Sequence, residues 1–176
     1  MNSTNERDTP EYYRLRRRAI EIIDSVSQTT CRYCLDPCCE RRLCMRAYET
    51  FRPLIDLEPK AHAIHDAAAA KASVNPFLDA DGCMFSILRP AVCMSYYCDK
   101  SLSGLLRPQQ FCVLALGRAF PDEEITDFSE LRFLEYVLTV CEAVVRKGDM
   151  LPERDRRKLI ARVPGLNERM RLYVVS

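Results

Sequence analysis

Seven of the ten cysteines of this chain gather at the two ends of one stretch, residues 31–98. The group at the first end is Cys31, Cys34, Cys38 and Cys39, and the group at the second end is Cys83, Cys93 and Cys98. Thiolate is a soft, anionic ligand that suits zinc or an iron–sulfur cluster. Two groups so far apart in the sequence can share a metal only where the fold brings them together. We therefore expect a metal or a cluster to join them.

The spacing within the first group favours metal binding over other uses of thiols. Cys31 and Cys34 form a C-x-x-C pair, which suits one metal ion, and Cys38 and Cys39 follow closely. A redox pair of the thioredoxin type would need a βαβ context, which this sequence lacks. In a reduced compartment, clustered cysteines act as ligands or redox groups more often than as disulfides. Free thiols and disulfides are the less favoured alternatives.

Length and charge limit the classes of protein that fit. A chain of 176 residues suits one domain with its own core, so we expect a single domain over residues 1–176. The 26 basic and 25 acidic residues give a net charge of +1, and no overall field attracts nucleic acid or an anionic membrane. The first residues are polar, and no stretch reaches the roughly 20 apolar residues of a membrane span. We expect a cytoplasmic protein that binds neither membrane nor nucleic acid and whose protein partner is unknown.

Helical spacing of apolar residues recurs along the chain, and no run shows convincing period-two alternation, so we predict an all-α fold. The first helix begins with Pro10 at its first position, carries an apolar stripe and fades near residues 28–30. Further helices are expected over 40–51, from Pro59 to about residue 73, over 127–148 and after Pro152, while 108–120 is a short helix or an extended piece. The region 31–98 is the irregular, metal-binding centre between these helical flanks.

Two clusters of basic residues are interleaved with acidic residues, which is typical of helix faces in water. We expect both clusters to be solvated. The first consists of Arg14, Arg16, Arg17 and Arg18, and the second of Arg154, Arg156, Arg157 and Lys158.

The remaining cysteines and the two histidines have simpler interpretations. Cys112 and Cys141 lie in apolar segments, where a thiol packs as a small hydrophobe. Cys44 lies close enough to the first group to be a reserve ligand. His62 and His65 are three residues apart but next to no cysteine group, so we expect surface positions. No arrangement of residues identifies a catalytic group.

The two cysteine groups together resemble a known family, the zinc- or iron-chelating cysteine-cluster proteins described by the pattern C-x-x-C-x-x-C-C. Its members show a Cys-Pro-Phe-Leu segment, an acidic turn with glycine, a cysteine, Arg-Pro and another cysteine. The corresponding residues here are Asn75 to Leu78, Asp79 to Gly82, Cys83, Arg89-Pro90 and Cys93. The resemblance covers about residues 31–98 and implies metal binding, with Arg89 offsetting thiolate charge. Some relatives are similar to iron–sulfur proteins, and one branch is linked to methylation of flagellin lysines, but no methyl-donor site is visible here.

This chain departs from the family pattern at two places. The first group has one extra residue after Cys34, and Asn75 stands where the family has a cysteine. Either Cys98 or Cys44 supplies the missing ligand, or the site holds fewer metals, or an iron site stays open.

These observations favour a metal-binding protein with an iron–sulfur cluster, such as [4Fe–4S], or zinc, in a structural or electron-transfer role. One alternative is an enzyme with an open iron or cluster site. The other is a zinc-stabilised interaction module that uses Arg32, Tyr33, Arg41 and Arg42.

Overall fold

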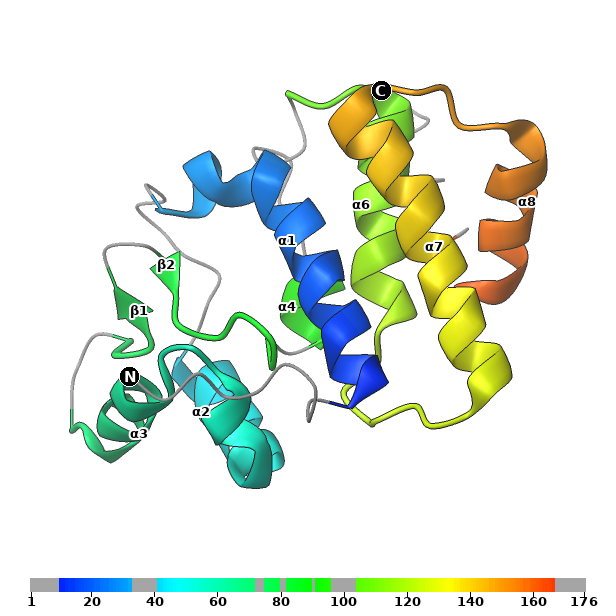
Figure 1. Cartoon of the computed structure of the whole chain (residues 1–176). Coiled ribbons are helices and arrows are strands. Elements are labelled where there is room, and N and C mark those ends of the chain that lie inside the picture. The colour runs from blue at the N-terminus through cyan, green and yellow to red at the C-terminus, as the bar shows by residue number, and fades with distance from the viewer. Residues whose placement is uncertain are drawn as a thin grey trace.

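Helices form almost all of the regular structure that the chain shows (Figure 1). The computed structural model describes residues 10–32, 41–71, 75–79, 82–89, 91–95 and 104–166, and for 27–32, 79, 82, 92 and 95 it describes the backbone alone. The helices are α1 (Glu11–Arg32), α2 (Arg41–Phe51), α3 (Ala61–Ala69), α4 (Ala91–Ser95), α6 (Arg107–Ala119), α7 (Phe128–Lys147) and α8 (Glu153–Arg162), together with the 3-10 helix η2 (Arg52–Leu57). The all-α prediction is confirmed. Among the described residues, no helix is long and apolar enough to cross a membrane.

The first helix, α1, lies at the centre of the arrangement. Its predicted apolar stripe is buried, with Tyr12, Ala19 and Ile22 at most 1% exposed, and it packs against α6 and α7. The helix continues to Arg32, past its expected end near residues 28–30, because no Gly or Pro interrupts that segment. The backbone of Cys31 therefore belongs to the last turn of α1.

The core of the larger helical group is the antiparallel pair α6 and α7. Residues 111–117 are buried around the whole circumference of α6, so this segment is a central helix and not an extended piece. The C-terminal half of α7 contributes Cys141, which faces Cys112 of α6, and both thiols are free and fully buried. The prediction that these two cysteines pack in the core is confirmed.

Both ends of α7 follow the sequence signals that predicted them. The Asp127 carboxylate accepts a hydrogen bond from the Glu130 backbone amide at 3.0 Å, which caps the first turn. Gly148 ends the helix in the left-handed conformation with φ of 73°. The Glu130 side chain accepts a hydrogen bond from Arg162 of α8 at 2.8 Å, which links the start of α7 to the end of α8.

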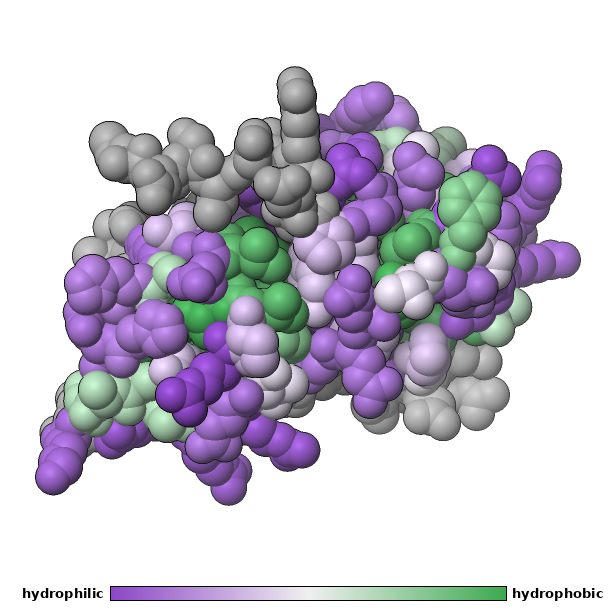
Figure 2. Space-filling view, turned by 60° about the horizontal axis from the view of Figure 1, so that its bottom comes forward, coloured by the Kyte–Doolittle hydropathy of each residue, from purple (hydrophilic) through white to green (hydrophobic). Residues whose placement is uncertain are grey.

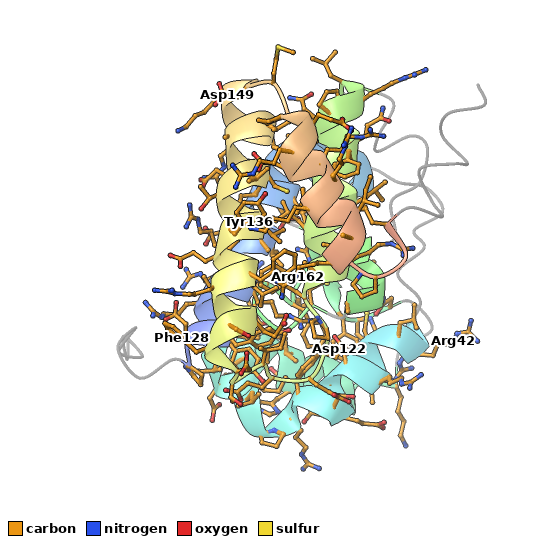
Figure 3. The ribbon with its side chains drawn as sticks, turned by 90° about the vertical axis from the view of Figure 1, so that its right-hand side faces the viewer. Arg42, Asp122, Phe128, Tyr136, Asp149 and Arg162 are labelled. Atoms are coloured by element: carbon orange, nitrogen blue, oxygen red, sulfur yellow. The ribbon has the colours of Figure 1, made fainter. Side chains whose placement is uncertain are left out.

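The last helix, α8, lies along α7 and uses its cations to cover aromatic rings (Figure 3). The Lys158 ammonium is 3.7 Å from the centre of the Tyr136 ring, and the Arg162 guanidinium is 3.8 Å from that of Phe133. The Tyr136 hydroxyl also donates to Asp155 at 2.8 Å. This helix is therefore attached by the buried Leu159 and by charged side chains that cover the aromatic rings of α7.

On the other side of α1 lies a smaller group made of α2, η2, α3 and a hairpin (Figure 1). The strands are β1 (Leu78–Asp79) and β2 (Gly82–Cys83), which pair antiparallel. Strands of two residues are too short to produce an alternating pattern, so the sequence did not predict them. The hairpin is anchored by Phe77, whose ring stacks on Phe85 with 5.6 Å between ring centres. The helix α2 ends at Phe51, as the range 40–51 predicts, and Pro53 follows it in the first turn of η2.

The second basic cluster is solvated as predicted, since Arg154, Arg156, Arg157 and Lys158 are exposed.

Figure 2 shows hydrophilic side chains over most of one face of the molecule, with hydrophobic residues visible between them.

The first basic cluster is solvated only in part, and the prediction for Arg16 is wrong. The Arg16 side chain is completely buried, while its three basic neighbours are exposed. Its guanidinium donates to the Tyr12 hydroxyl at 2.9 Å, the Arg89 carbonyl at 2.6 Å, the Asp122 carboxylate at 2.9 Å and the Pro121 carbonyl. A buried cation needs such partners, because an unpaired charge is costly away from water. Arg16 follows Tyr12 by four residues, so helical spacing places it on the buried face.

Candidate metal centre

The structure describes the side chains of two of the seven predicted ligands, Cys83 and Cys93. Only the backbone of Cys31 is described, at the end of α1. The other four, Cys34, Cys38, Cys39 and Cys98, lie outside the described residues. Among the described side chains, no three of His, Cys, Asp and Glu form a group able to hold a metal ion. Of the predicted ligands, Cys83 has the most fully described surroundings.

Cys83 lies on β2, opposite Leu78 of β1, and is partly buried. Its sulfur accepts a hydrogen bond from the backbone amide of Phe85, two residues further on. Burial raises the pKa of the Cys83 thiol to about 11, while the Arg89 guanidinium and the Phe85 amide oppose this rise. The irregular backbone predicted for this region thus places the Phe85 amide against the Cys83 sulfur.

The loop after Cys83 is held by a buried carboxylate that the sequence analysis missed. Glu58, only 3% exposed, follows η2 and accepts hydrogen bonds from the amides of Ser86, Ile87 and Leu88, with shortest distances of 2.9, 2.9 and 2.6 Å. The Ser86 hydroxyl donates to the same carboxylate at 2.8 Å. Charge-assisted bonds of this kind are the strong ones. Glu58 thus fixes the course of the chain between Cys83 and Cys93. No sequence pattern marks it out among the other acidic residues.

Arg89 joins the end of this loop to α1. Its guanidinium forms a bidentate ion pair with the Asp24 carboxylate, with N–O distances of 2.6 and 2.8 Å. The predicted role of Arg89 beside thiolates is compatible with this pair, since its charge also lowers the pKa of Cys83. Asp24 precedes Cys31 by two helical turns, so the ion pair fastens the second cysteine group to the helix that ends in the first. Pro90 lies outside the described residues.

Cys93 lies in the short helix α4, which packs on α6. The first amide of α4, that of Ala91, donates to the Asp122 carboxylate at 2.7 Å, and Asp122 also pairs with the buried Arg16. The Cys93 side chain is partly exposed. Its position is therefore set by the same network that buries Arg16.

The element that carries Cys31 approaches the strand that carries Cys83. The helix α1 contacts β2, and Figure 1 shows the C-terminal end of α1 extending over the hairpin. Cys31 lies in the last turn of α1, and Cys83 is the last residue of β2. The chemistry of this set fits a soft metal, because thiols are its main donors and an amide and a guanidinium already face one of them.

The reserve ligand Cys44 also belongs to these surroundings. It is buried in α2 at 3% exposure, and its sulfur accepts a hydrogen bond from the Asn75 amide nitrogen at 3.5 Å. Burial raises the pKa of Cys44, and this bond lowers it in part. The structure thus places Asn75 beside Cys44, the cysteine predicted as a reserve ligand.

The histidines occupy exposed positions away from this region, as predicted. His62 lies 3.5 Å from Asp66 one turn along α3, and His65 is 2.9 Å from the Tyr48 hydroxyl of α2.

Comparison with known proteins adds no relative to this description. No protein-family model matches the chain, and no curated protein and no solved structure is significantly similar to it. The resemblance to the zinc- or iron-chelating cysteine-cluster proteins over residues 31–98 therefore stays a prediction.

Proposed function

We propose that this protein binds a metal centre, an iron–sulfur cluster or zinc, between its two cysteine groups. The setting of Cys83 carries this proposal. Its sulfur accepts an amide hydrogen bond, Arg89 lies near it, and Glu58 fixes the loop that follows. Partners of this kind orient a metal ligand and are nearly as important to the site as the ligand itself.

The proposed ligands are the seven cysteines Cys31, Cys34, Cys38, Cys39, Cys83, Cys93 and Cys98. A single zinc ion takes four thiolates, so this number favours a [4Fe–4S] cluster with further thiols nearby or two metal ions. Zinc would add folding free energy alone, whereas a cluster would also carry electrons.

Loading the centre requires that Cys83 lose its proton. Its pKa of about 11 keeps the thiol protonated at neutral pH when no metal is bound. A thiolate ligand must be deprotonated, so each such thiol releases one proton when the metal binds. Metal affinity should therefore rise with pH across the neutral range, by about tenfold per unit for each protonated ligand.

The proposal is tested by purifying the protein without oxygen and measuring iron, acid-labile sulfide and zinc. We expect a stoichiometric metal, and we expect its loss in Cys83→Ala and Cys93→Ala. Cys141→Ala is the matched control, because that thiol is equally a cysteine but lies in the core between α6 and α7. Iron with sulfide would identify a cluster and support electron transfer. A colourless protein with zinc would support the structural role.

Two results would contradict the proposal. One is a wild-type protein that holds neither metal and whose thiols all titrate freely after unfolding. The other is equal metal loss in Cys83→Ala and Cys141→Ala, since this would show a general effect on folding and not on ligation.

A further inference from the structure

Cys44 and Asn75 are held together in a way that packing alone does not require. Cys44 lies on the buried face of α2, where a thiol normally acts as a small hydrophobe. Here a polar side chain is directed at its sulfur, because the Asn75 Nδ2 atom donates to the Cys44 Sγ atom at 3.5 Å. An N–H donor stabilises the anionic form of sulfur more than the neutral thiol.

The orientation of the Asn75 amide is fixed by its other end. Its Oδ1 atom accepts a hydrogen bond from the Phe77 backbone amide at 3.2 Å. A backbone N–H can only donate, so the oxygen must face Phe77 and the NH2 group must face Cys44. The donation to sulfur therefore does not depend on how the two ends of the amide are assigned.

The same contacts place Cys44 next to the hairpin that carries Cys83. The Phe77 carbonyl accepts from the Met84 amide at 3.0 Å, one residue beyond Cys83. Asn75 thus links α2 to the hairpin through Phe77. The Cys44 thiol and the residue after Cys83 are therefore connected through three hydrogen bonds, from Asn75 to the Cys44 sulfur, from Phe77 to Asn75 and from Met84 to Phe77.

We propose that Cys44 is a thiolate ligand of the same metal centre as Cys83, and that Asn75 positions its sulfur. This inference rests on the proposed function, and it adds an eighth cysteine to the ligand set. It also assigns Asn75 a role outside the ligands, as a hydrogen-bond donor to one of them.

The test counts sulfur ligands in the wild type and in variants. Proteins purified without oxygen are measured for metal content, and the apo forms are loaded with Co²⁺, whose sulfur-to-metal absorption reports thiolate ligands. X-ray absorption at the bound metal gives the sulfur number directly. We expect Cys44→Ser to lose one sulfur ligand and to bind Co²⁺ at least about tenfold more weakly than the wild type.

Cys141→Ser is the matched control, because it makes the same change at another buried helical cysteine. We expect it to destabilise the fold and to keep the wild-type absorption. Cys44→Ala is measured alongside, since it removes the ligand without burying a hydroxyl.

Asn75 is tested with Asn75→Asp and Asn75→Ala. Both remove the N–H donor to sulfur, but Asn75→Asp keeps an oxygen for the Phe77 amide. We expect both variants to shift the sulfur-to-metal absorption and to weaken Co²⁺ binding by roughly 10- to 100-fold.

The outcomes separate this inference from the proposed function. If the wild type binds no metal, both fail. If the wild type binds metal, and Cys44→Ser and Cys44→Ala keep its sulfur number and affinity, the inference alone is overturned. If Asn75→Asp has the absorption and affinity of the wild type, the role of Asn75 is wrong.

Discussion

Single buried charges determine the course of the chain near the candidate centre. The Glu58 carboxylate accepts hydrogen bonds from three consecutive backbone amides that belong to no helix or strand. The Arg16 guanidinium likewise donates to two backbone carbonyls. Burying backbone groups without hydrogen-bond partners would cost free energy. Each charged side chain therefore supplies the partners that a helix or strand would otherwise provide. The irregular loop around Cys83 is therefore well defined without being regular.

We expect Glu58→Gln to lower the free energy of unfolding by about 2–3 kcal/mol. Glutamine has the same shape, but its NH2 group would face amides that can only donate, and the charge that strengthens these bonds is lost. Chemical denaturation measures the change. Asp56→Asn is the control, because this carboxylate is exposed on η2 only two residues away and should change stability by less than about 0.5 kcal/mol. Equal effects in the two variants would show that Glu58 does not hold the loop.

At the scale of the elements, a glycine ends α7, one of the two long helices of the core. Gly148 adopts φ of 73° after α7, and a Cβ atom placed on it would meet nothing within 4 Å. Any cost of a side chain there comes from backbone conformation and not from a clash.

We therefore expect Gly148→Ala to destabilise the protein by about 1 kcal/mol. Gly104→Ala is the matched control, since a Cβ atom at Gly104 also meets nothing within 4 Å and its φ is not in the left-handed region. Its effect should stay within about 0.5 kcal/mol. Thermal unfolding of both variants compares them, and a Gly104→Ala loss as large as that of Gly148→Ala would rule out the conformational explanation.

Elements with a local signal were predictable from the sequence, and contacts between distant residues were not. The Asp127 cap, the Gly148 stop and the apolar stripe of α1 each follow from residues a few positions apart. The burial of Arg16 had a local signal in its spacing from Tyr12, but its acidic neighbours hid it. Glu58 had no signal, because its partners are 28 to 30 residues away. The link between Cys44 and Asn75 likewise exists only in the folded chain.

At the scale of the whole molecule, the two helical groups differ in what stabilises them. The pair α6 and α7 buries long apolar faces, whereas α3 has nine residues and each strand has two. Helices and hairpins this short are marginal on their own. A metal that joins β2 to the end of α1 would contribute most to the smaller group.

We expect removal of the metal with a chelator to speed amide hydrogen exchange in α2, α3 and the hairpin, and to leave α6 and α7 protected. Exchange measured by mass spectrometry resolves the two groups. In Cys83→Ala, which should bind no metal, the chelator should cause no further change. Loss of protection in α6 and α7 to the same extent would show that the metal stabilises both groups alike.

The packing of α1 against α7 has a consequence for how the protein is made. The ribosome completes residues 31–98 before it begins α7, so α1 has no α7 surface on which to bury its stripe while the thiols are already in solution. During this interval the cysteines are accessible and their geometry is not yet fixed. If the protein binds a metal as proposed, the nascent chain would meet metal ions and oxidants before its ligands are in place, and correct loading would depend on the order of synthesis as well as on the final fold.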